Sequence, residues 1–295
     1  MLSVSHLVKH YGKIQALKGV SFEVPEGSVF GILGPNGSGK TTLLSIVLGV
    51  LSADAGNYEW FGQTASPALR KQIGSLLETP NFYHYLSAVN NLKVTQSISG
   101  RGDQPAIEKV LQQVNLFERR HSKFSSYSLG MKQRLAIAAA LLGDPKILVL
   151  DEPTNGLDPV GIAEIRSLIL ALRDKGHTII MASHLLDEVE KVCSHVAILK
   201  TGTLVACGAV QDVLAQEDMV ELAASDLQQL AALLQSMPGV HSVSVSAQSV
   251  SISLPRGSAR LDEINRYCFE NGMVLTHLML KRKRLEEKFF ELTHT

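Results

Sequence analysis

"SVFGILGPNGSGKTTLLSIVLGVL", residues 28–51, is the stretch that decides the fold. Its first six residues form a near-continuous apolar run, as expected for a buried strand of a parallel sheet. A glycine-rich loop follows, and the residues from Lys40 onward have the length and periodicity of a helix. The loop fits the pattern G-x-x-x-x-G-K-[ST] between a strand and a helix, which predicts a phosphate-binding loop.

The residue types of this loop suit a nucleoside triphosphate. Glycines allow backbone N–H groups to turn inward around phosphate oxygens, and the helix N-terminus adds positive potential. Lys40 is expected to reach the β- and γ-phosphates, and the Thr41 hydroxyl is placed to bind Mg²⁺. The expected nucleotide-binding residues are Gly34, Pro35, Asn36, Gly37, Ser38, Gly39, Lys40, Thr41 and Thr42. No guanine-reading motif is found, so we expect ATP and Mg²⁺ as cofactors.

A pair of acidic residues ends a second apolar run, "ILVLDEP" at 147–153. A strand that carries two carboxylates at its C-terminal end delivers them to the ligand-binding edge of an α/β sheet. Asp151 suits a contact with Mg²⁺. Glu152 is then placed to act as the general base that polarises an attacking water. Together with the phosphate loop, this pair predicts hydrolysis of the bound triphosphate.

The remaining patterns predict an α/β domain of the P-loop NTPase type over residues 1–214. Alternating residues predict antiparallel strands at 2–8 and 14–24, and a run of helices fills about 86–142 as a helical subdomain. Strands alternate with helices elsewhere, which favours a mostly parallel sheet. The other strands are expected at 72–77, 146–151, 177–183 and 195–200, with helices at 160–174 and 185–192.

The periodicity restarts in the last part of the chain. Residues 215–295 give the order β-α-β-β-α-β, which predicts a small α+β domain of the ferredoxin-like type. Nothing in this accessory domain indicates a ligand.

Composition narrows the class of protein. Lys plus Arg and Asp plus Glu both number 28, so no nucleic-acid binding driven by overall charge is expected. The three cysteines are far apart, which is typical of reduced thiols. The N-terminus lacks the apolar core of a signal peptide, and no run approaches the ~18 apolar residues of a membrane helix. We expect a soluble protein that reaches a membrane only through a partner.

Four further motifs carry a family resemblance. "YSLGMKQR" (127–134) precedes the helix that leads to the acid pair, and "NGLD" (155–158) follows that pair. His184 comes just after "TIIMAS", and Tyr11 lies in "KHYGK". In this order the motifs resemble those of the nucleotide-binding subunit of an ABC transporter. The matches are to its signature loop, the loop after its second acidic motif, its switch histidine and its adenine-stacking aromatic residue.

The resemblance implies a head-to-tail homodimer that encloses two ATP molecules. Ser128 and the Gly130 backbone would approach the γ-phosphate bound in the partner copy, since a helix N-terminus favours anions. Asp158 would contact the phosphate loop of the partner copy. His184 would hold the γ-phosphate and the attacking water in line, although a lone histidine at a strand end is more often structural.

Three positions depart from the commonest family pattern. Leu129 stands at the first glycine of the signature and Met131 at its glutamine, while the serine and the second glycine are kept. Glu78, after the expected strand at 72–77, stands where most relatives have a glutamine that reaches Mg²⁺. A glutamate keeps the metal-binding oxygen but loses an N–H donor and adds negative charge. Glu78 is therefore a third candidate ligand of Mg²⁺, after Thr41 and Asp151.

Glu78 and the altered signature resemble one subgroup of ABC exporters, the bacitracin and lantibiotic immunity type. In that subgroup the following loop receives a cytoplasmic helix of the membrane subunit. Phe82, Tyr83 and Tyr85 are candidates for this contact, although they would equally suit packing within the subdomain. The resemblance thus implies an integral membrane transporter subunit as partner and a location at the cytoplasmic face of the cell membrane.

Two other classes of ABC protein fit the motif arrangement less well than an exporter ATPase. Soluble ABC proteins that act on ribosomes usually carry two ATPase domains, and chromosome-type ATPases separate their motifs by a long coiled coil. This chain has one set of motifs, with only about 90 residues between the phosphate loop and the signature. An importer subunit stays open, because export rests on the subgroup resemblance alone. The transported substrate is not encoded in this chain.

Overall fold

The computed structural model describes residues 1–64, 66–77, 81–214, 217–255, 257–281 and 289. The chain divides into two compact units, Met1–Val210 and Gln211–Thr295. A short helix, α8 (Val210–Leu214), lies at the boundary in the sequence. Within the ranges described, no helix is long and apolar enough to cross a bilayer.

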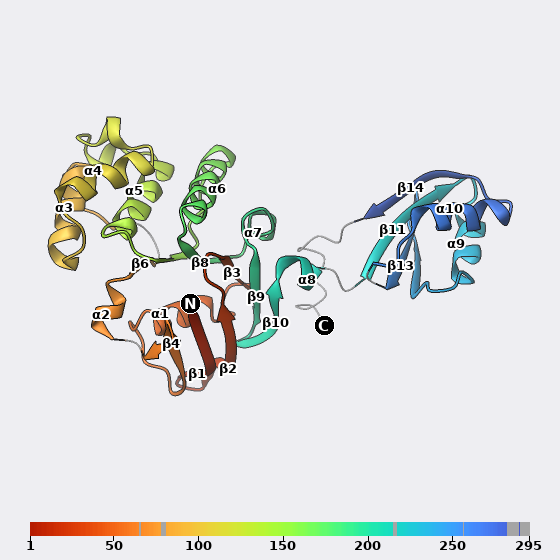
Figure 1. Cartoon of the computed structure of the whole chain (residues 1–295), viewed down its shortest axis with the longest axis horizontal. Coiled ribbons are helices and arrows are strands. Elements are labelled where there is room, and N and C mark those ends of the chain that lie inside the picture. The colour runs from red at the N-terminus through yellow and green to blue at the C-terminus, as the bar shows by residue number, and fades with distance from the viewer. Residues whose placement is uncertain (65, 78–80, 215–216, 256, 282–288, 290–295) are drawn as a thin grey trace. The chain divides into compact units, whose positions relative to one another are not determined.

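A six-stranded sheet in the order β10-β9-β3-β8-β7-β6 forms the centre of the first unit (Figure 1). Its strands are β3 (Val29–Leu33), β6 (Ile73–Leu76), β7 (Ile147–Asp151), β8 (Thr178–Ser183), β9 (His195–Lys200) and β10 (Thr203–Ala209). Neighbours pair in parallel except β9 with β10. The predicted mostly parallel α/β sheet is therefore confirmed. Because β8 lies between β3 and β7, the carboxyl ends of these three strands meet at one edge of the sheet.

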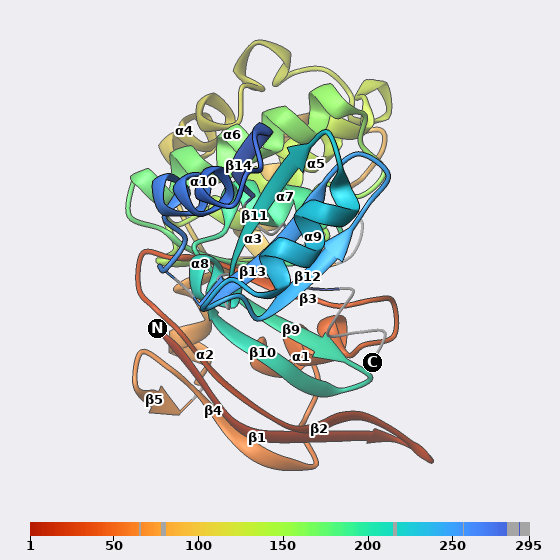
Figure 2. The ribbon, with the colours of Figure 1, turned by 90° about the vertical axis from the view of Figure 1, so that its right-hand side faces the viewer.

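An antiparallel sheet in the order β2-β1-β4-β5 lies beside α1, the helix that begins at Lys40 (Figure 2). β1 (Leu2–Tyr11) and β2 (Ile14–Val24) form the hairpin that the alternating pattern predicts. β4 (Ala55–Trp60) and β5 (Gln63–Thr64) were not predicted. β4 begins with Ala-Gly and has few apolar positions, so its strand character comes from pairing with β1.

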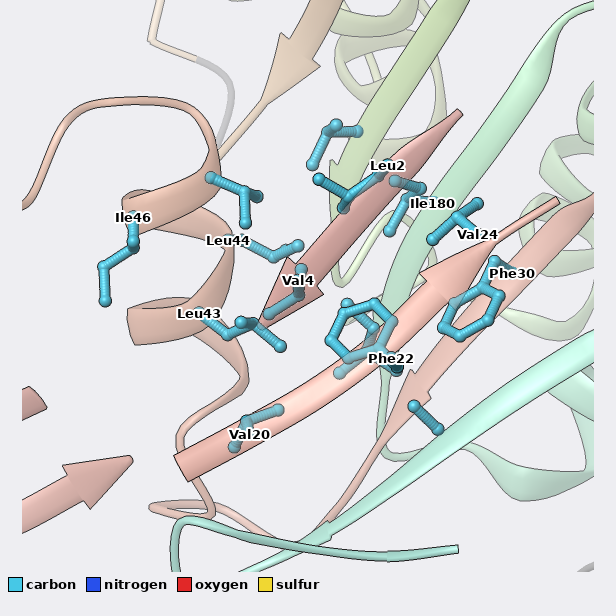
Figure 3. Packing of buried hydrophobic residues seen from close by; sticks show 14 of the residues in the cluster. Leu2, Val4, Val20, Phe22, Val24, Phe30, Leu43, Leu44, Ile46 and Ile180 are labelled. Atoms are coloured by element: carbon cyan, nitrogen blue, oxygen red, sulfur yellow. The ribbon is translucent and has the colours of Figure 1, made fainter. Parts of the chain in front are cut away.

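Helix α1 (Lys40–Val47) is held by the main hydrophobic core. Leu43 and Leu44 of α1 belong to one buried cluster with Val4 of β1 and Phe22 of β2 (Figure 3). Phe22 also stacks on Phe30 of β3, with ring centroids 5.4 Å apart. This packing fixes the position of the helix whose first residues form the end of the phosphate loop.

Three of the helices of the first unit, α3, α4 and α5, lie in the predicted subdomain, and α2, α6 and α7 lie outside it. These helices are α2 (Pro67–Arg70), α3 (Ala88–Ser99), α4 (Gln104–Gln113), α5 (Leu129–Leu141), α6 (Pro159–Asp174) and α7 (Leu186–Val192). Two 3₁₀ turns, Phe117–Arg119 and Phe124–Ser126, join α4 to α5. The side chains of Ser87, Asp103 and Ser128 accept backbone N–H groups at the starts of α3, α4 and α5.

The second unit has the predicted ferredoxin-like topology. Its elements are β11 (Glu217–Ala224), α9 (Leu227–Gln235), β12 (Ser242–Val245), β13 (Val250–Pro255), α10 (Leu261–Glu270) and β14 (Leu275–Lys281). The sheet order is β12-β13-β11-β14, and every neighbouring pair is antiparallel. Leu230 of α9 and Ile264 of α10 share one buried cluster with Val220 and Ile252 of the sheet, so both helices pack on the same face.

We expect Trp60→Ala to destabilise the first unit by about 3–5 kcal/mol, the usual cost of removing a buried tryptophan. Trp60 is fully buried, and its indole N–H donates to the carbonyl of Val47 at the end of α1, 2.8 Å away. Urea unfolding followed by circular dichroism measures the change. The control Ile98→Ala, at a residue that is 82% exposed on α3, should change stability by less than ~0.5 kcal/mol. Equal effects of the two substitutions would contradict the prediction.

Candidate functional site

The loop between β3 and α1 has the backbone of a phosphate cradle. Gly37 and Gly39 adopt φ angles of +80° and +104°, a region that residues with a Cβ atom rarely enter. Gly39 caps α1 without any side-chain hydrogen bond, so the first N–H groups of the helix point toward the loop. The arrangement presents backbone donors and the positive end of α1 to one point.

Gly34 and Gly39 are also required by close approach of other segments. A Cβ atom on Gly34 would lie 2.5 Å from the carbonyl oxygen of Leu199 on β9. A Cβ atom on Gly39 would lie 2.6 Å from the carbonyl oxygen of Ala16 on β2. The loop is therefore held tightly between β9 and the antiparallel sheet.

Lys40 lies inside the cradle that its neighbours form. Its ammonium donates to the carbonyl oxygens of Gly34, at 2.8 Å, and Pro35, at 3.3 Å. Glu152 lies 3.8 Å away, and only 7% of the Lys40 side chain is exposed. Burial lowers the pKa of Lys40, while the charges of Glu152 and Asp151 oppose that shift. A buried cation thus faces the space where phosphates would lie.

Thr41 and Asp151 meet across the loop. The Thr41 hydroxyl donates to Asp151 Oδ2 at 2.9 Å, and Asp151 is buried at the end of β7. A hydroxyl and a carboxylate are oxygen ligands of the kind that Mg²⁺ prefers. This donor set fits the metal expected from the sequence. The third candidate, Glu78, lies outside the described residues.

Glu152 and His184 form a second contact at the same edge. His184 Nδ1 and Glu152 Oε2 are 2.8 Å apart, and the histidine follows β8 directly. Glu152 has φ +48°, a left-handed conformation that is strained for a residue with a side chain. Its N–H donates to the carbonyl of Ala182 on β8, 3.0 Å away, which holds the strained residue in place. The carboxylate therefore lies between Lys40 and His184.

One open cavity of about 490 Å³ joins these groups. Tyr11, 48% exposed at the end of β1, lines it from the side of the antiparallel sheet. Its lining residues are Tyr11, Ala16, Asn36, Gly37, Gly39, Lys40, Thr41, Thr42, Glu152, Asn155 and His184. Gly34, Pro35 and Ser38 complete the same loop. Ala16 and Asn155 were not predicted, because an alanine and a turn asparagine carry no signal without the fold.

Three candidate residues lie apart from this cavity. Ser128 accepts the N–H of Met131 at 3.3 Å and starts α5, and Gly130 is half-buried in the first turn. Asp158 accepts the N–H of Gly161 at 2.8 Å and starts α6. None of the three lines the cavity that contains Lys40. Ser128 and Asp158 cap helices in their own chain, and both residues are exposed.

Comparisons with known proteins identify relatives of this chain. A family model described as "ABC transporter" matches residues 17–155. The chain is 34% identical over 297 residues to the bacitracin transport ATP-binding protein BcrA of Enterococcus faecalis, covering 99% of this chain and 96% of that protein. It is 40% identical over 205 residues to the lantibiotic transport ATP-binding protein SrtF of Streptococcus pyogenes, covering 70% of this chain and 89% of that protein.

A solved structure of a dimeric ATP-binding cassette, in a post-hydrolysis state with ADP and Pi, is also similar. The TM-score is 0.64 at 25% sequence identity, and the match covers 71% of this chain and 99% of that chain. The similarity therefore extends from sequence to fold.

We expect Gly34→Ala to weaken ATP binding at least about tenfold, because the new methyl group would press on the backbone of β9 and displace the loop. Isothermal titration calorimetry with ATP in EDTA measures the change without turnover. The control Gly100→Ala, at the C-cap of α3, adds a methyl group far from the loop and should leave ATP affinity unchanged. A Gly34→Ala protein with normal affinity would contradict the assignment of the cradle.

Proposed function

The chain belongs to the ABC transporter family as an ATP-binding and ATP-hydrolysing subunit, and on that premise we propose that it powers an exporter. The observation that carries the proposal is the cavity where the phosphate loop, Glu152 and His184 meet, with Asp151 hydrogen-bonded to Thr41 of that loop. The names of the relatives, bacitracin and lantibiotic transport, support a role in efflux of or immunity to a peptide antibiotic. They favour this function over a soluble ATPase that acts on ribosomes or nucleic acid, and over an importer subunit.

The cradle binds the triphosphate in this proposal. Backbone N–H groups of the loop and the N-terminus of α1 surround the phosphates, and Lys40 supplies the positive charge. The Lys40 ammonium now rests on two loop carbonyls, so it needs only to reorient toward the β- and γ-phosphates. Tyr11 offers an exposed ring at the same cavity, which suits stacking on adenine.

Thr41 and Asp151 are the proposed ligands of Mg²⁺, with Glu78 as a third. When bound, the ion would neutralise phosphate charge and fix the leaving group. The chain contributes the oxygen pair, already 2.9 Å apart at the loop, and orients it through β7.

Glu152 is the proposed general base and His184 its partner. The carboxylate accepts the proton of the attacking water, since it lies beside Lys40 at the edge where the γ-phosphate would lie. His184 Nδ1 faces Glu152 at 2.8 Å, which leaves Nε2 for the phosphate. In this arrangement the histidine would hold the γ-phosphate and the attacking water in line.

A homodimer completes each site in this proposal. Ser128, Gly130 and Asp158 lie outside the cavity of their own chain, at exposed helix starts that suit a phosphate of a second copy. The dimeric cassette with ADP and Pi supports such an assembly. Leu129, 47% exposed, lies with its side chain near Gly156, in the loop that follows the acid pair.

The loop at 81–87 is the proposed contact with a membrane subunit at the cytoplasmic face of the membrane. Buried Asn91 holds this loop by accepting the N–H of Tyr83 at 2.8 Å and donating to its carbonyl at 3.1 Å. Tyr83 and Tyr85 are 51% and 69% exposed, and their rings contact each other. Phe82 packs instead on Phe124, with ring centroids 5.2 Å apart. The two tyrosines are therefore available to a partner, and Phe82 anchors the loop.

Glu152→Gln is expected to slow ATP hydrolysis by about 100-fold or more, because an amide cannot accept the proton of the water. Phosphate release measures the rate, and calorimetry should show that ATP still binds. Glu108→Gln, an exposed position on α4, makes the same change of charge away from the site and should keep the parent rate. A Glu152→Gln protein that hydrolyses ATP normally would remove Glu152 from the mechanism.

The Glu152→Gln chain, tagged and held with Mg-ATP, should recover a multi-span membrane protein from detergent-solubilised cells, as mass spectrometry would show. Tyr83→Ser with Tyr85→Ser should lower that recovery several-fold, because it removes the exposed aromatic contact. Ile98→Ser, at an apolar position on α3 that is even more exposed, serves as the control. Recovery of ribosomal proteins in place of a membrane protein would favour the soluble ATPase.

A further inference from the structure

Asp54, just before β4, contacts the end of β1 that carries Tyr11. Its Oδ2 accepts the backbone N–H of His10 at 2.6 Å and lies 3.1 Å from Nδ1 of the same residue. Its Oδ1 accepts from the Lys9 ammonium at 3.0 Å. The Asp54 N–H donates to the carbonyl of Val8 at 2.8 Å. One residue thus binds three consecutive residues immediately before Tyr11.

The strand pairing explains why this contact matters. β1 pairs with β4 only as far as Val8, opposite Ala55, while its pairing with β2 continues to Tyr11, opposite Ile14. The register with β2 also shifts between Lys9 and His10. Among the residues that the structure describes, the last residues of β1 therefore have no strand on the β4 side. The Asp54 carboxylate takes the place of that strand for the N–H of His10.

Lys9 extends the contact to the ring of Tyr11. Its ammonium, fixed by Asp54, lies 6.0 Å from the centroid of that ring, within the range of a cation–π interaction. The Lys9 side chain is only 16% exposed, whereas Tyr11 is 48% exposed and lines the cavity. Asp54 therefore constrains both the backbone before Tyr11 and a cation beside its ring.

From these contacts we infer that Asp54 is a positioning residue for nucleotide binding, which holds Tyr11 where it stacks on the base of the nucleotide. The inference rests on the proposed role of Tyr11 and adds a residue that no motif marks. The hydrogen bonds from Lys9 and from the N–H of His10 lower the pKa of Asp54 to about 2. The carboxylate is thus charged at neutral pH.

The test distinguishes the contribution of the base to nucleotide binding from that of the phosphates. Calorimetry in EDTA measures binding of ATP and of inorganic triphosphate, which has no base, to the full chain. Asp54→Ala should weaken ATP binding by about 3- to 10-fold and leave triphosphate binding unchanged, since only base stacking is affected. Asp54→Asn, which keeps an acceptor oxygen, should show a smaller loss. In hydrolysis assays KM should rise while kcat stays constant.

A double-variant comparison and a matched control complete the experiment. In a Tyr11→Ala background, Asp54→Ala should cause no further loss, because the ring that it positions is gone. Glu23→Ala removes an exposed carboxylate near the other end of the same hairpin and should have no effect. An equal loss of triphosphate binding, or a full loss in the Tyr11→Ala background, would overturn the inference.

Two further outcomes distinguish a failure of this inference from a failure of the proposed role of Tyr11. If Tyr11→Ala weakens ATP binding but the Asp54 variants do not, the inference fails while the role of Tyr11 stands. If Tyr11→Ala binds ATP like the parent, the role of Tyr11 fails and the inference fails with it.

Discussion

The parallel pairing of β8 between β3 and β7 is the constraint on which the rest of the structure depends. These strands end at Leu33, Asp151 and Ser183. Leu33 precedes the other two residues by more than a hundred positions in the sequence. Their register places the loop after β3, the acid pair and His184 at one edge, where α/β sheets bind ligands. The contacts of Thr41 with Asp151 and of Glu152 with His184 follow from that alignment.

Electrostatic balance in the cavity is local and does not follow from the overall charge of the chain. The net charge is zero, yet a desolvated lysine lies 3.8 Å from the Glu152 carboxylate, which in turn lies 2.8 Å from His184. Burial lowers the pKa of Lys40, and the charges of Glu152 and Asp151 oppose part of that shift. The oxygens of an incoming polyphosphate would replace the present partners of the Lys40 ammonium. The protein thus holds this charge in place before the ligand binds.

Much of the fold could be predicted from the sequence because its signals are local. Apolar runs mark the buried parallel strands, and the glycine pattern at 34–41 marks the cradle. β4 and β10 were missed, because their strand character depends on neighbours that are distant in the sequence. Asn155 and Asp54 were missed for the same reason: one becomes a cavity wall and the other a backbone contact only after folding. The left-handed backbone at Glu152 likewise has no signal in its residue type.

The left-handed backbone at Glu152 sets the stability of the fold against the proposed catalytic role of this residue. A conformation of this kind costs of order 1–3 kcal/mol for a residue with a side chain, and glycine or asparagine would relieve part of it. Chains that lose the proposed base could therefore gain resistance to unfolding. Selection for stability alone would favour variants that no longer hydrolyse ATP. Only selection for ATP turnover keeps a glutamate at a position where the backbone disfavours one.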